Sequence, residues 1–174
     1  RSSVSVFNSK GAISGKAAKA LAEELESEVD KALGYIESIR EAKAEITTLE
    51  EQVRIFEKLA PLNISLDLLS GFSGVEVYVA ETANSSKASK VFADLKNEIE
   101  IMAPAGLVAV ACAPNKAAEV QIALAELNAK AIQLPPGEGK PAQRASDARK
   151  TIESTTASLE SNQKSLDAWA EKHG

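Results

Sequence analysis

Apolar and small residues recur at alternating spacings of three and four in two stretches of the chain, 21–60 and 145–169. This spacing averages 3.5 residues and keeps one side of an α-helix facing a partner helix over many turns. We therefore predict two long helices, at 16–60 and 140–174, that pair antiparallel as a two-stranded coiled coil. We expect the seam between them to contain Ile39, Ala42, Ile46, Leu49, Val53, Phe56, Ala148, Ile152, Thr155, Leu159, Asn162, Leu166 and Trp169.

The first of these helices is expected to be unusually long. Residues 16–59 contain no proline and only one glycine, Gly34, and Pro61 ends the pattern. A helix of about 44 residues would be roughly 66 Å long at 1.5 Å per residue. In its first half, Val29, Leu33 and Ile36 widen the apolar side beyond what one partner helix covers. We expect a further element to pack there.

The segment between the helices, 61–139, has a different pattern. Residues alternate between apolar and polar at 75–80 and 98–102, and two further strands are predicted at 107–112 and 129–134. Helical patterns begin near Ser86 and Pro114. The order β-α-β-β-α-β is that of a ferredoxin-like lobe. The predicted fold class is therefore α+β, a long antiparallel helical hairpin with a small ferredoxin-like lobe at its tip.

The predicted sheet has one face for the two lobe helices and one face for solvent or a partner protein. Alternation places on the helix-covered face Val75, Val77, Val79, Ile99, Ile101, Val108 and Val110. The opposite face, which we expect to be available for a partner, would present Glu76, Tyr78, Glu98, Glu100 and Met102. The pair Glu98 and Glu100 is what any polar outer face of a strand looks like, and it does not by itself indicate acid–base chemistry.

The predicted organisation has four parts: 1–15, 16–60, 61–139 and 140–174. The first part contains a short β-like run at 4–7, which we interpret as a residual strand or linker of a second lobe. Ser14 is a suitable helix cap before the first long helix. The chain begins with Arg1 and not with methionine, so we interpret it as a fragment or a processed form.

Composition and charge exclude several classes of protein. The net charge is −5 and no basic stripe exists, so we expect no nucleic-acid partner. Cys112 is the only cysteine and lies in an apolar run, which predicts a buried, inert thiol and excludes an intramolecular disulfide. No apolar run approaches the roughly 20 residues that a membrane-spanning helix needs. Long alanine-rich, aromatic-poor helices fit this composition.

No catalytic, cofactor-binding or metal-binding residues are predicted, and no small-molecule ligand is expected. The only histidine, His173, is one residue from the end of the sequence, and no short metal-ligand spacing occurs. The glycines at 11 and 15 before Lys16 are one residue too close for a phosphate-binding loop, and Ala17 replaces the hydroxyl that reaches magnesium. Thr155 and Asn162 are better explained as residues that fix the register of the coiled coil.

Several segments resemble the cytoplasmic half of subunit I (subunit a) of rotary A/V-type ATPases. The similar segments are LEEQV at 49–53, LAPLNISLDLL at 59–69, VEVYVA at 75–80, VAVACA at 108–113, AKAIQLP at 129–135 and GKP at 139–141. Together with the long helices, the resemblance covers about 16–174, and it lies in pattern and order.

This resemblance implies a non-catalytic stator arm that braces the ion-translocating membrane half during proton or sodium transport coupled to ATP synthesis or hydrolysis. The implied partners are the peripheral-stalk subunits E and G (or H), the other stator subunits and the chain's own membrane half. The implied location is the cytoplasmic side of a membrane complex, with this fragment itself soluble. The channel arginine of the family lies in the membrane half, so no residue of this sequence takes its role.

Two other functions remain open at this point. A ligand-sensing module is one, because split-βαβ lobes can bind small molecules as paired domains. A general coiled-coil adaptor, such as a tethering or chaperone arm, is the other.

Overall fold

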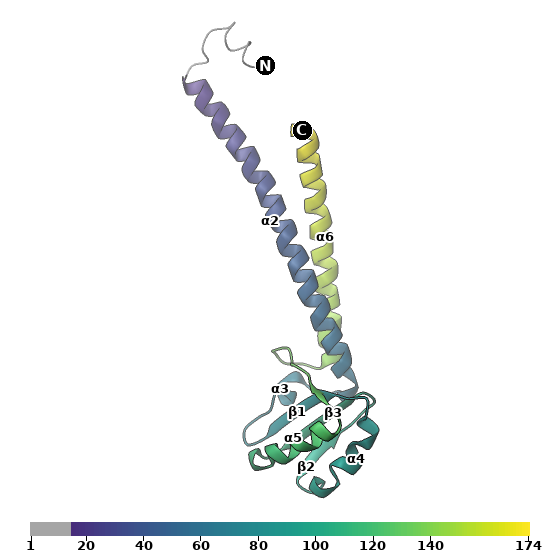
Figure 1. The fold of residues 1–174 in the computed structure, drawn as a ribbon. Coiled ribbons are helices and arrows are strands. Elements are labelled where there is room, and N and C mark those ends of the chain that lie inside the picture. The colour runs from purple at the N-terminus through teal and green to yellow at the C-terminus, as the bar shows by residue number, and fades with distance from the viewer. Residues whose placement is uncertain (1–14) are drawn as a thin grey trace. The chain divides into compact units, whose positions relative to one another are not determined.

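The computed structural model describes residues 15–174, so the strand expected at 4–7 and the cap expected at Ser14 lie outside the described residues. Two long helices, α2 (Gly15–Leu59) and α6 (Pro141–His173), begin and end close to the predicted positions (Figure 1). After α2, a 3₁₀ turn (Ala60–Leu62) leads to Asn63, whose positive φ of 51° ends the helical path. Pro141 opens α6, where the missing N–H of proline costs nothing.

The chain divides into two compact units. One contains the described residues up to 45 together with 155–174, and the other contains 46–154. Both long helices pass from one unit into the other. The second unit therefore holds the lobe together with the last turns of α2 and the first turns of α6.

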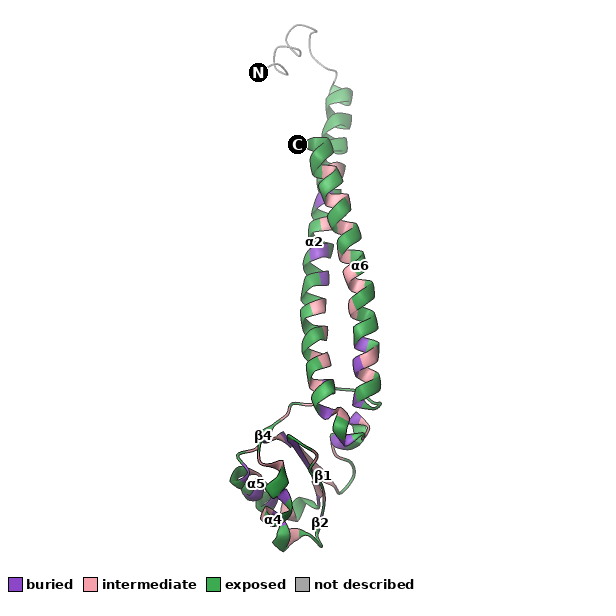
Figure 2. Cartoon of the chain, turned by 90° about the vertical axis from the view of Figure 1, so that its right-hand side faces the viewer, coloured by how far each residue is buried: buried purple, intermediate pink, exposed green. Residues whose placement is uncertain are grey.

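Burial along both long helices follows the three-four spacing, as the purple and pink positions of Figure 2 illustrate. On α2 the buried or half-buried positions at this spacing are Glu28, Ala32, Tyr35, Ile39, Ala42, Ile46, Leu49, Val53 and Phe56. On α6 they are Pro141, Ala145, Ala148, Ile152, Thr155, Leu159, Asn162, Leu166 and Trp169. All thirteen residues expected in the seam fall at these positions.

Contacts between the two helices run in opposite order along them. In the unit of 15–45 and 155–174, His173 Nε2 lies 3.3 Å from Glu28 Oε2. In the unit of 46–154, Arg149 forms an ion pair with Glu57, and Ala145 packs in the same cluster as Phe56. Residues near the start of α2 therefore contact residues near the end of α6, and residues near the end of α2 contact residues near the start of α6. This is the antiparallel pairing that the sequence predicts.

The lobe contains β1 (Glu76–Glu81), β2 (Ile99–Met102), β3 (Leu107–Cys112) and β4 (Lys130–Ala131). The sheet order is β2-β3-β1-β4 and every pair is antiparallel. Between the strands lie α4 (Ala88–Val91) and α5 (Ala117–Glu126), and α3 (Leu66–Leu69) precedes the sheet. The split-βαβ order is present, and the α+β fold class is confirmed.

Two elements of the lobe are shorter than the sequence predicts. β4 has two residues, Lys130 and Ala131, where 129–134 was expected. The N–H of Ile132 makes the last backbone bond to β1, to Val79 O at 3.0 Å. The helix expected from Ser86 is a run of short turns, Ser85–Lys87, Ala88–Val91 and Ala93–Leu95.

Hydrophobic clusters cover both faces of the sheet. The first cluster lies under α4 and α5 and includes Ala80, Phe92, Ile99, Val108, Val110, Cys112, Val120 and Leu127. The second lies on the other face and joins the sheet to the bases of the long helices through Phe56, Leu59, Leu62, Leu66, Leu69, Val79, Leu107, Ala109 and Ala145. Thr82 supports the first cluster from one end, since its Oγ1 donates to Leu127 O at 2.6 Å.

The predicted assignment of residues to the two faces is wrong for β1. Tyr78 pairs with Val110 and packs on the cluster under α4 and α5, whereas Val79 pairs with Ala109 in the cluster of the helix bases. Val77, paired with Ala111, packs against that second cluster too. The prediction assumed that one face of the sheet is open, but the helix bases cover it and place the valines of β1 there.

Candidate functional site

The five residues expected to form one partner-binding face, Glu76, Tyr78, Glu98, Glu100 and Met102, do not share a face. Glu76 and Tyr78 lie on the side of α4 and α5, where Tyr78 Oη donates to Glu76 Oε2 at 2.7 Å. That hydrogen bond, aided by burial, raises the pKa of Tyr78 to about 12. These two side chains hold each other and contribute to the lobe's own packing.

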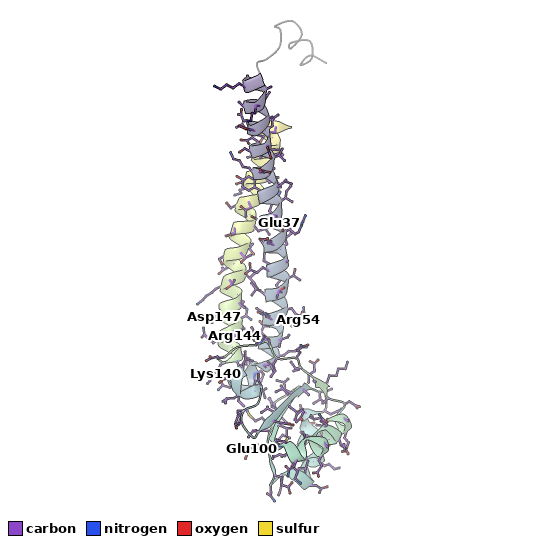
Figure 3. The ribbon with its side chains drawn as sticks, turned by 90° about the vertical axis from the view of Figure 1, so that its left-hand side faces the viewer. Glu37, Arg54, Glu100, Lys140, Arg144 and Asp147 are labelled. Atoms are coloured by element: carbon purple, nitrogen blue, oxygen red, sulfur yellow. The ribbon has the colours of Figure 1, made fainter. Side chains whose placement is uncertain are left out.

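Glu98, Glu100 and Met102 lie at the β2 edge of the lobe. Glu98 Oε2 is 2.7 Å from Lys116 Nζ, and this contact is the main reason that the pKa of Lys116 is raised. Glu100 pairs with Ala111, so it lies on the face of the helix bases, and it is exposed there (Figure 3). Met102 is on the same face and 41% exposed. Only Glu100 and Met102 of the five therefore form a free surface opposite α4 and α5.

The best-organised polar site in the described residues is the joint between the lobe and α6. Arg144, in the first turn of α6, donates from Nη1 to Pro136 O at 3.2 Å and to Glu138 O at 3.1 Å, and from Nη2 to Pro136 O at 3.2 Å. Its guanidinium carbon lies 5.0 Å from the centre of the Phe56 ring on α2. One side chain thus joins the loop, α6 and α2.

The joint loop is fitted closely around this guanidinium. Gly137 has a φ of +116°, and a Cβ at this position would lie 2.5 Å from Arg144 Nη1. The next part of the loop is bound to the start of α3, where Leu66 N–H donates to Gly139 O at 3.0 Å and Gly139 N–H donates to Ser65 Oγ at 3.1 Å. The lobe, the loop and α6 are therefore linked by backbone as well as side-chain hydrogen bonds.

The sequence of 135–141 is rich in proline and glycine, which indicates a turn-rich connection, but it does not point to Arg144 or Ser65. The glycines and prolines of 135–141 signal a turn, yet nothing in their spacing tells which cation the loop encloses. An arginine three residues after the proline that opens a helix is the signal that could have found it. Such a side chain lies within reach of the carbonyls that precede the helix.

The far ends of the long helices hold a second small cluster of charged and aromatic groups. His173 contacts Glu28 and also lies against Trp169, with ring centroids 4.7 Å apart. Lys31 Nζ donates to Glu28 Oε1 at 3.3 Å, and this hydrogen bond is the main cause that lowers the pKa of Glu28. His173 thus joins the end of the seam. Thr155 and Asn162 are half-buried at seam positions.

The chemistry of the described residues is limited. Within 15–174, no group of three or more His, Cys, Asp or Glu side chains is placed to hold a metal ion. Burial raises the pKa of the Cys112 thiol, which therefore stays protonated and unreactive at neutral pH. Among these residues, no helix is both long and apolar enough to cross a membrane.

No protein-family model and no curated protein matches the chain. Among solved structures, the chain is similar to one described as "Crystal structure of the cytoplasmic N-terminal domain of subunit I, homolog of subunit a, of V-ATPase". The two sequences are 14% identical, and the match covers 92% of this chain and 67% of that chain with a TM-score of 0.45.

Proposed function

We propose that the chain is a non-catalytic stator arm of a rotary A/V-type ATPase, on the cytoplasmic side of the membrane. The choice of this family rests on the sequence resemblance to subunit I. The observation that carries the mechanical role is the hydrophobic cluster that joins the sheet to both helix bases through Phe56, Leu59, Val79 and Ala145. A lobe held in this way cannot turn on its helices without breaking a core.

A stator must transmit force between a membrane part and a peripheral stalk. Force applied to the lobe passes into α2 through the cluster around Phe56 and into α6 through the Arg144 joint. Two paired helices resist bending more than one helix does. Small seam residues such as Ala42 and Ala148, 8% and 7% exposed, allow the backbones to approach closely.

The proposed partners are the peripheral-stalk subunits E and G (or H), the other stator subunits and a membrane half of the same protein. We assign the stalk contact to the lobe. Its free surface at the β2 edge, with Glu100 and Met102, is the part of the expected binding face that remains exposed. Proton or sodium transport and ATP synthesis or hydrolysis belong to the whole complex in this proposal.

The test is a binding measurement with the purified E–G (or E–H) heterodimer encoded by the same genome. Isothermal titration calorimetry with the full chain should give a dissociation constant in the micromolar range, which corresponds to a binding free energy of about −8 kcal/mol. Glu100→Arg should weaken binding, and Ile122→Ser on α5, where Ile122 is 64% exposed, should leave it unchanged. Binding that is insensitive to Glu100→Arg would move the contact elsewhere on the chain. Absence of a complex both in calorimetry and in gel filtration of the mixture would refute the stator role and favour an adaptor for other proteins.

A further inference from the structure

We draw no further inference here: the strongest candidate, the outer edge of β4 (Lys130–Ala131), with which no other strand of 15–174 pairs, carries nothing because nothing in the structure shows what covers it.

Discussion

The joint around Arg144 can be tested by a single truncation, Arg144→Ala. The substitution removes the hydrogen bonds to Pro136 O and Glu138 O and the contact with the Phe56 ring. Both carbonyls lie in an exposed loop and can bind water instead, so the bonding to each carbonyl is worth about 0.5 kcal/mol, the low end of the usual range. The ring contact adds about 0.5–1 kcal/mol. The aliphatic stem loses its packing as well, so the total is about 2 kcal/mol.

The two units have separate natural probes, which makes the measurement specific. Cys112 is the only cysteine, is 4% exposed and belongs to the unit of 46–154. Its rate of reaction with a disulfide reagent therefore reports the opening of that unit. Trp169 is the only tryptophan and belongs to the other unit, so its fluorescence reports the far ends of the helices. A loss of about 2 kcal/mol should raise the labelling rate of Cys112 about thirtyfold.

The matched control is Arg149→Ala on the same helix. Arg149 makes an ion pair with Glu57 in which both side chains are 53% exposed, and such surface pairs contribute about 0–1 kcal/mol. Its effect on Cys112 labelling should be less than about fivefold. If Arg144→Ala changed the labelling rate no more than Arg149→Ala does, the loop would not be held by the guanidinium. The account of the joint given above would then be wrong.

Ile46→Asp and Leu159→Asp should each lower the free energy of unfolding by about 1–3 kcal/mol, because each places a carboxylate at a half-buried seam position; thermal melts that match the parent would contradict the seam. Gly34→Ala should stabilise the unit of 15–45 and 155–174 by up to about 1 kcal/mol, seen in a Trp169 fluorescence melt, because a Cβ there meets nothing within 4 Å and alanine favours helix. Tyr78 should titrate near pH 12 by ultraviolet absorbance, and Glu76→Gln should lower that midpoint because it removes the carboxylate that holds the phenol proton. Since the folded pKa of Tyr78 is above the ordinary value of 10, the stabilisation from this group is complete below pH 10 and is lost as the pH rises through about 12.

The long helices and the sheet order could be predicted from the sequence, because their patterns extend over many residues. The three-four spacing of α2 and α6 persists for whole helices, and β3 was predicted at its observed bounds. The alternation of apolar and polar residues gave the wrong sheet face for β1, because it assigned Tyr78 to the exposed face. The whole of Leu107–Cys112 is apolar, so β3 gave no information on which side of the sheet is open. The covering of the second face depends on Leu62, Leu66 and Leu69, residues outside the sheet pattern.

The candidate sites, too, could be predicted from the sequence only where their residues repeat at a regular spacing. The seam could be found because it repeats, whereas the guanidinium contact of Arg144 depends on one side chain meeting carbonyls six and eight residues earlier. No periodicity encodes such a contact. The excess apolar width of α2 at Val29, Leu33 and Ile36 was also visible in the sequence, and these three side chains are exposed in the structure.

The lobe and the adjoining turns of α2 and α6, at 46–59 and 141–154, belong to one compact unit and share one hydrophobic cluster. Inserting seven residues into α2 before 46 and seven into α6 after 154 preserves the heptad phase and leaves the contacts within this unit unchanged. Each such insertion lengthens its helix by roughly 10 Å. The number of heptads in the other unit can therefore change without any change in the packing of the lobe.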